Sequence, residues 1–294
     1  MSDAGDQEQA AEVAAAALIA AFAGQAAFLA KHLGTGATIG HEPDRVLPTA
    51  STIKLLVLAE LFRQVEAGEA ALDESLAIDQ DDRRGGSGIL KDLAPDLRLS
   101  ARDHAVLMTA LSDNTSTAVL VRRLGLARIL ASARAWGMPN TAATFAGETI
   151  REYATSTPRD IVRLLTLIAT DQLVSPTGCA AIRDILLTQQ YHDQIGRHLP
   201  FNQYARQGAN HRGPVVIRSK SGFTAPVRVD AGLVELPGGI QYAICLMTDE
   251  SRERHFRPDH DGAILNGSIS RLVFDAWWPE GVPLPTDRQL SPND

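Results

Sequence analysis

The stretch STIKLLVLAELFRQVEAG, residues 51–68, decides how the rest of this sequence is interpreted. It has no proline and no glycine before its last residue, and its first half is apolar on nearly every side of a helix. Such a helix is stable only when other elements surround it. The stretch therefore predicts a central, buried helix that begins near Ser51.

Other helices are predicted on both sides of this stretch. Good helix formers fill residues 9–33 and stop at Gly34, which predicts an N-terminal helix. The short segments 37–40 and 45–47 flank the turn-like cluster HEPD, so we expect a hairpin between them. Further helical patterns cover residues 101–111, 116–124, 127–135, 158–170 and 177–189.

The periodicity changes to that of strands near Val215. The runs VVIRSKSG, VRVDAGLVEL and IQYAICLMT are separated by turn residues, and PGG at residues 237–239 predicts a hairpin turn. A closing helix is predicted over residues 263–278. We expect the Pro-rich end, residues 280–294, to be a disordered tail.

This order of elements predicts an α+β fold with two lobes. An antiparallel sheet flanked by the two terminal helices forms one lobe, and an inserted all-α block forms the other. We expect residues 1–48 and 207–279 to make the α/β lobe and residues 49–206 the all-α lobe, together one domain. A cleft between the lobes would hold the functional site.

The pair Ser51 and Lys54 is the first candidate for chemistry. Residues three apart lie on one face of a helix, so the Lys54 amine can lie beside the Ser51 hydroxyl. The helix N-terminus adds free backbone N–H groups that favour an oxyanion. A serine becomes a nucleophile when a base takes its proton, and Lys54 can do so if its pKa is depressed.

Two further motifs make this pair more than a chance occurrence. SDN lies at residues 112–114 between two helical segments, and KSG lies at residues 220–222 in a predicted strand. S-x-x-K, S-D-N and K-T-G together mark class A β-lactamases and penicillin-binding proteins, and Ser221 supplies a hydroxyl where the usual threonine stands. About residues 30–277 closely resemble this class A β-lactamase and penicillin-binding type of serine hydrolase.

The resemblance implies a serine β-lactamase and DD-peptidase-like fold and a set of catalytic roles. By this likeness Ser51 is the nucleophile that attacks a lactam carbonyl, and Lys54 is a base for acylation. Ser112 would relay a proton to the leaving nitrogen. The backbone N–H groups of Ser51 and Phe223 would form the oxyanion hole, where the loss of one donor typically costs about 10²–10³ in turnover.

Substrate binding is implied in the same way. Asn114 would hold the substrate amide, and Lys220 with Ser221, next to Gly222 in the same strand, would bind the substrate carboxylate. Arg228 follows this strand and is a candidate second clamp for a carboxylate. A purely structural ion pair is the alternative for Arg228.

The sequence departs from the family where deacylation is expected. The E-x-x-L-N pentapeptide, whose glutamate activates the deacylating water in class A enzymes, is absent. The shortened segment between Trp136 and Thr155 has Glu148 and Glu152 as its acidic residues. Glu148 is our candidate for the missing base, with a solvated loop carboxylate as the alternative.

The composition bears on which partners the protein binds and on where in the cell it is found. The net charge is −7, with 28 basic and 35 acidic residues, so no basic field attracts nucleic acid. Two cysteines support neither a disulfide framework nor a metal site, and no cofactor is expected. The first dozen residues are acidic, without a basic n-region, and no apolar run reaches membrane-spanning length. We expect a monomer that acts on a small molecule without membrane contact, cytoplasmic as written, although relatives of this type are usually exported.

Three functions are consistent with these residues. The first is hydrolysis of the β-lactam amide through a Ser51 acyl-enzyme. The second uses the same Ser51 nucleophile for another reaction. The protein would be an intracellular esterase or amidase, or a penicillin-binding protein that deacylates slowly because its general base is missing. The third is a non-catalytic acyl sink that serves as a ligand sensor.

Overall fold

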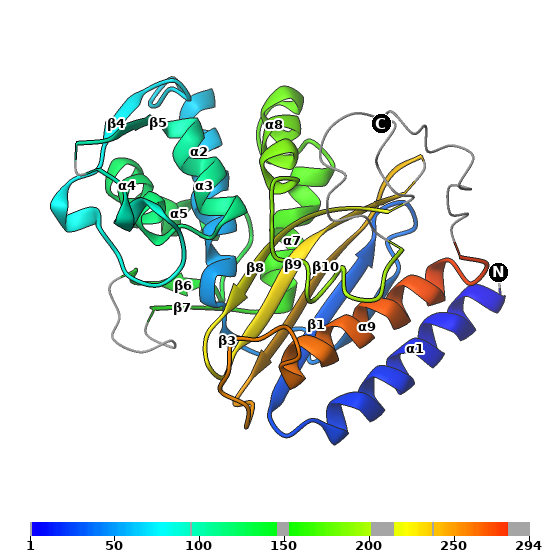
Figure 1. The fold of residues 1–294 in the computed structure, drawn as a ribbon. Coiled ribbons are helices and arrows are strands. Elements are labelled where there is room, and N and C mark those ends of the chain that lie inside the picture. The colour runs from blue at the N-terminus through cyan, green and yellow to red at the C-terminus, as the bar shows by residue number, and fades with distance from the viewer. Residues whose placement is uncertain (1, 95, 146–152, 201–214, 237, 282–294) are drawn as a thin grey trace, which may run out of the picture.

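The computed structural model describes residues 2–94, 96–145, 153–200, 215–236 and 238–281 (Figure 1). At its centre lies a five-stranded antiparallel sheet in the order β2-β1-β10-β9-β8. The strands are β1 (Gln25–His32), β2 (Thr38–His41), β8 (Val216–Phe223), β9 (Arg228–Leu236) and β10 (Gly239–Asp249).

The two terminal helices cover one face of this sheet. Helices α1 (Ser2–Ala21) and α9 (Asp261–Trp277) lie side by side across it (Figure 1). Alternate residues of β9 and β10, such as Val234 and Ile244, point into the apolar core beneath these helices. The alternation of side chains along a strand sends the neighbouring residues to the opposite face.

A larger core lies on that opposite face. It joins helix α2 (Lys54–Glu66), which follows the 3₁₀ turn η1 (Ala50–Ile53), to the sheet residues Val229, Ala231 and Cys245. Leu56 and Leu58 of α2 are almost fully buried, as expected for a helix that is apolar on several sides. The surrounding helices are α3 (Ala101–Ala110), α4 (Asn114–Leu124), α5 (Leu126–Ala135), α7 (Pro158–Ala169) and α8 (Pro176–Leu186).

Short elements complete the fold around these helices. A three-stranded sheet has the order β3-β7-β6, and β4 pairs with β5. These elements are β3 (Leu47–Pro48), β4 (Ser75–Ala77), β5 (Arg98–Ser100), β6 (Ala142–Ala143), β7 (Ala154–Ser156), and the 3₁₀ turns η2 (Gln80–Asp82) and η3 (Leu90–Asp92).

Two sequence predictions near the N-terminus are wrong. The predicted helix over residues 9–33 is a helix that ends at Ala21 and a strand that begins at Gln25. The predicted hairpin between residues 37–40 and 45–47 is also wrong, because β2 pairs with β1 whereas β3 pairs with β7. Pairing with distant strands therefore outweighs the local preference in both segments.

The larger predictions fit the structure. The α+β fold, with an antiparallel sheet flanked by terminal helices and a separate group of helices, is confirmed. The boundary at residue 207, the turn residue Pro237 and residues 282–294 of the predicted tail lie outside the described residues, so the lobe limits stay a prediction. Across the described residues, no helix is both long and apolar enough to span a membrane.

Candidate active site

Ser51 lies in the 3₁₀ turn that leads into the buried helix α2. The preceding residue, Ala50, has a φ of 44°, which is strained for a residue with a Cβ. Strand β8 reaches this turn so closely that a Cβ on Gly222 would lie 2.8 Å from the Ser51 nitrogen and 2.7 Å from the Thr49 oxygen. Glycine at position 222 is therefore what lets the strand lie against the turn that carries Ser51.

Lys54 is buried one helical turn from Ser51 and is held by the SDN segment. Its Nζ donates to the Ser112 carbonyl oxygen at 2.8 Å, to Ser112 Oγ at 3.1 Å and to Asn114 Oδ1 at 2.7 Å. A lysine ammonium has three N–H donors, so these three acceptors satisfy it completely. A neutral Lys54 amine would instead accept a hydrogen bond, and Ser112 Oγ is placed to donate it.

The surroundings of Lys54 favour its neutral form. Burial lowers its pKa well below the ordinary value, and repulsion from the Lys220 ammonium lowers it further, while Asp113 opposes the shift. Burial also lowers the pKa of Lys220 to about 7, with Asp230 acting in the opposite direction. An amine with a depressed pKa is available as a base near neutral pH.

The SDN segment is fixed by its middle residue. Asp113 caps α4 by accepting from the Ser116 N–H at 2.8 Å, and its other oxygen accepts from the N–H groups of Ile89 at 2.7 Å and Leu90 at 3.0 Å. Ser112 has a φ of 54° and is, after Ala50, a second strained residue of the site. Asp113 therefore fastens the loop of residues 85–90 to the start of α4.

Asn114 is tied to that same loop. Its backbone N–H donates to the Ser87 oxygen at 3.1 Å, and its side-chain Nδ2 donates to the Gly85 oxygen at 2.9 Å. Asn114 Oδ1 accepts from Lys54, so the amide group has a fixed orientation. The structure thus brings Ser51, Lys54, Ser112 and Asn114 together, as the motifs predict.

The side chains of Lys220 and Ser221 in the KSG segment are both buried. Lys220 is 1% exposed and its Nζ donates to the Ser221 carbonyl oxygen at 2.6 Å. The Ser221 hydroxyl is fully buried and has no hydrogen-bond partner among the described residues. Neither side chain is among the residues that line the pocket at Ser51, and their binding of a substrate carboxylate stays a prediction.

Arg228, the candidate clamp for a substrate carboxylate, is hydrogen-bonded to backbone oxygens, and its role as a clamp stays a prediction. Its guanidinium donates to the backbone oxygens of Thr224 at 2.6 Å, Val227 at 2.8 Å and His255 at 2.6 Å. The side chain is buried and lies outside the pocket lining. Arg228 joins the turn after β8 to the segment before α9.

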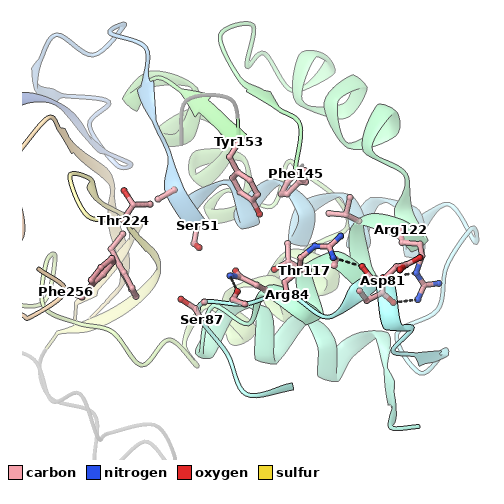
Figure 2. A pocket seen from close by; sticks show the side chains of 18 residues that line it. Ser51, Asp81, Arg84, Ser87, Thr117, Arg122, Phe145, Tyr153, Thr224 and Phe256 are labelled. Carbon is pink, nitrogen blue, oxygen red and sulfur yellow. Dashed lines mark hydrogen bonds and ion pairs between the residues drawn. The ribbon is translucent and has the colours of Figure 1, made fainter. Parts of the chain in front are cut away.

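The pocket at Ser51 has a volume of about 730 Å³. Figure 2 shows Thr224 and Phe256 on one side of Ser51, with Tyr153, Phe145 and Arg84 on the other. Phe223, the predicted oxyanion-hole residue, also lines the pocket, and its ring packs edge-on against Phe256 and Tyr191. Aromatic rings therefore lie on both sides of Ser51.

Several pocket residues were not found from the sequence. Arg84, Phe145, Tyr153 and Phe256 belong to loops or to short segments between elements, where no periodic pattern marks the residues that face a site. Arg84 directly precedes the glycines of the 85–90 loop, which was the available clue. Glu148, the candidate deacylation base, lies outside the described residues.

A cluster of possible metal ligands lies at Glu253, His260 and Asp261. His260 Nδ1 accepts from the Gly262 N–H at 3.1 Å, and Glu253 Oε2 accepts from the Asp261 N–H at 2.7 Å. Arg228 is close enough to lower the pKa of His260 electrostatically, after the larger effect of burial. The atoms that would bind a metal ion thus already accept hydrogen bonds at the start of α9, and the buried Arg228 guanidinium is close to them.

This arrangement of a serine, a buried lysine and the SDN loop beside a sheet edge defines a class of protein. The model of the Beta-lactamase enzyme family matches residues 10–277. The chain therefore belongs to the β-lactamase enzyme family.

Individual relatives are similar over nearly the whole chain. The structure of a PBP-A mutant in an acyl-enzyme complex with penicillin-G has a TM-score of 0.80 and 27% identity, covering 94% of this chain and 97% of that one. A β-lactamase from Sphaerobacter thermophilus has a TM-score of 0.80 and 26% identity, covering 93% and 98%. The β-lactamase regulatory protein BlaB of Streptomyces cacaoi is 26% identical, covering 84% of this chain and 91% of that protein.

Proposed function

We propose that this protein is a serine hydrolase that opens the β-lactam amide through an acyl-enzyme on Ser51. The observation that carries the proposal is the buried Lys54 amine, one helical turn from Ser51, with a depressed pKa and a hydrogen bond to Ser112 Oγ. Membership of the β-lactamase family and the likeness to a penicillin-acylated protein support it.

The proposed acylation moves one proton in two steps. Neutral Lys54 removes the Ser51 proton as Ser51 Oγ attacks the lactam carbonyl carbon, and the resulting oxyanion is stabilised by backbone N–H groups at Ser51 and Phe223. When the carbon–nitrogen bond breaks, Lys54 passes its proton through Ser112 Oγ to the leaving nitrogen. The 3.1 Å contact between Lys54 Nζ and Ser112 Oγ supports this relay.

The fate of the acyl group depends on a base for water. Among the described residues that line the pocket, the carboxylates are Asp81 and Asp82, and Asp82 is bound to Arg122. Figure 2 shows Asp81 at the opposite end of the pocket from Ser51. The absence of an E-x-x-L-N pentapeptide from the sequence favours a second candidate, a penicillin-binding protein that keeps its acyl group, and the likeness to a regulatory protein favours it too.

Intact-protein mass spectrometry with benzylpenicillin over time tests the proposal. We expect a Ser51 adduct that forms and then disappears as product accumulates, and no adduct on Ser51→Ala. If Glu148 is the deacylation base, Glu148→Gln accumulates adduct while it acylates at the wild-type rate. A wild-type adduct that persists supports the second candidate, and undiminished labelling of Ser51→Ala contradicts both.

A further inference from the structure

The pocket does not end at Ser51. It continues along α4 into an arm, which we define by its lining residues Arg84, Thr117, Val121, Phe145 and Tyr153. Figure 2 shows Tyr153 and Phe145 on one side of the arm, with Thr117 and Arg84 facing them. None of these five residues has a role in the proposed acyl transfer, so the arm offers space for a part of the substrate that does not react.

Among the residues that the structure describes, four charged ones line the pocket near this arm. Asp82 and Arg122 neutralise each other, because Arg122 Nε donates to Asp82 Oδ1 at 3.0 Å and Arg122 Nη2 donates to Asp82 Oδ2 at 2.8 Å. Asp81 is exposed, as is Arg84, and Asp81 lies at the opposite end of the pocket from Ser51 (Figure 2). The remaining charge is the guanidinium of Arg84.

Arg84 is anchored through its backbone and one guanidinium nitrogen. Its backbone N–H donates to Thr115 Oγ1 at 3.1 Å, and Nη1 donates to the backbone oxygens of Asp81 at 2.6 Å and Arg83 at 3.5 Å. No carboxylate of the described residues forms an ion pair with Arg84. The next residue, Gly85, accepts from the Asn114 side chain at 2.9 Å, so Arg84 is held beside the predicted amide-binding residue.

Tyr153 contributes a second donor to the same space. Figure 2 shows its ring entering the pocket between Ser51 and Phe145. Within the described ranges its hydroxyl has no hydrogen-bond partner. Burial raises the pKa of Tyr153 to about 12, and Arg84 is the charged group that acts against this shift. The phenol therefore stays protonated at neutral pH and is available to donate.

We infer that the arm binds an anionic substituent on the acyl part of the substrate, a carboxylate held by the Arg84 guanidinium and the Tyr153 hydroxyl. A guanidinium matches a carboxylate in geometry as well as charge, and a partly enclosed site strengthens such hydrogen bonds. The opposite preference, for an ammonium, would need Asp81 to dominate. Asp81 and Arg84 are both exposed, but Asp81 lies at the opposite end of the pocket from Ser51 (Figure 2), whereas Arg84 adjoins Asn114. This inference rests on the proposed function for placing the acyl carbon at Ser51.

The test uses three penicillins that differ at one end of the acyl chain. 6-Aminopenicillanic acid acylated with hexanoic, adipic or 6-aminohexanoic acid carries a methyl, a carboxylate or an ammonium at the chain end. We expect the adipoyl compound to acylate the wild-type protein about tenfold more efficiently than the hexanoyl compound, because one charge-assisted hydrogen-bonded pair is formed. The 6-aminohexanoyl compound should be the slowest of the three.

Matched variants assign this preference to residues. Arg84→Gln should reduce the adipoyl-to-hexanoyl ratio of acylation rates about tenfold, and Tyr153→Phe should reduce it a few-fold. Arg84→Glu should reverse the order in favour of the 6-aminohexanoyl compound. Arg102→Gln, an exposed arginine of α3 outside the pocket lining, is the control and should leave the ratio unchanged.

Calorimetric titration of Ser51→Ala with the same compounds separates the two proposals, since this variant binds without acylation. A tenfold tighter binding of the adipoyl compound supports the arm even if the wild-type protein is never acylated, a result that would contradict the proposed function alone. Equal binding of the hexanoyl and adipoyl compounds, a preference for the ammonium, or no binding at all would overturn the inference, whatever the fate of Ser51.

Discussion

At the residue scale, the chemistry depends on which form Lys54 adopts. Its Nζ has three acceptors in reach, which suit the ammonium, while burial and Lys220 favour the amine. A base must be neutral to accept a proton, so acylation should increase as pH rises through the pKa of Lys54. The pH profile of acylation therefore reports on the surroundings of this one amine.

Replacing Lys220 by methionine tests this electrostatic coupling. Lys220 carries its charge below about pH 7 and lowers the pKa of Lys54 by repulsion. Lys220→Met removes the repulsion, so the pKa of Lys54 rises and the acidic limb of the acylation profile should move to higher pH. The measurement is the second-order rate of benzylpenicillin acylation as a function of pH, from acidic to neutral conditions.

Lys31→Met is the control for this shift. Lys31 lies in β1, outside the pocket lining, and its loss should leave the midpoint of the acidic limb in place. An unchanged midpoint in Lys220→Met, or one displaced to lower pH, would show that Lys220 does not set the pKa of Lys54.

The individual residues also show how much of the site could be predicted from the sequence. Ser51, Lys54, Ser112 and Asn114 were predicted as one constellation, because three spaced motifs identify them and the structure brings them together. The surroundings of Arg228 could not be predicted, because its position after β8 does not reveal that three carbonyl groups accept hydrogen bonds from its guanidinium. The sequence contains no information on which backbone oxygens a long side chain will meet.

At the element scale, the join between the 85–90 loop and α4 sets the shape of the site. Asp113 accepts from the backbone N–H groups of Ile89, Leu90 and Ser116 and is almost completely buried. The close approach also explains why residue 88 is a glycine. Its φ is +100°, and a Cβ at this position would lie 2.2 Å from Asp113 Oδ2. One carboxylate thus holds two elements together.

Asp113→Ala should destabilise the fold by about 2–4 kcal/mol, because it removes a helix cap and leaves buried N–H groups without acceptors. Ser100→Ala removes the exposed cap of α3 and should cost about 1 kcal/mol. Chemical denaturation of both variants gives the comparison. Equal losses of stability in the two variants would contradict the role given to Asp113.

The elements that were mispredicted share a physical cause. Residues 25–32, QAAFLAKH, are good helix formers by composition, yet they form β1, which pairs with β10 and β2 in the sheet. Gly24, directly before this strand, was the clue to a break in the helix. The buried helix after Ser51 and the three strands after Val215 were predicted well, because their patterns are long and each has one clear period.

At the scale of the whole molecule, one core connects the sheet to the helices around the site. The core that contains Leu56 and Leu58 of α2 also contains Val229, Ala231 and Cys245 of the sheet. Parts that share buried apolar contacts lose them together, so the two predicted lobes should not unfold separately.

Scanning calorimetry should therefore show a single unfolding transition, with a calorimetric enthalpy about equal to the van't Hoff enthalpy. The measurement therefore also tests whether the two predicted lobes form one cooperative unit. Two resolved transitions, or a van't Hoff enthalpy well below the calorimetric one for a single transition, would show that the lobes unfold independently.

The most direct test of Ser51 as the nucleophile is peptide mapping after a short exposure to benzylpenicillin. Trypsin releases residues 46–54, which contain Ser51, and residues 103–122, which contain Ser112. We predict that the penicilloyl group lies on the 46–54 peptide, at Ser51, and on no other peptide. An unmodified 46–54 peptide, with the protein unlabelled or labelled elsewhere, would contradict the claim that Ser51 is the nucleophile.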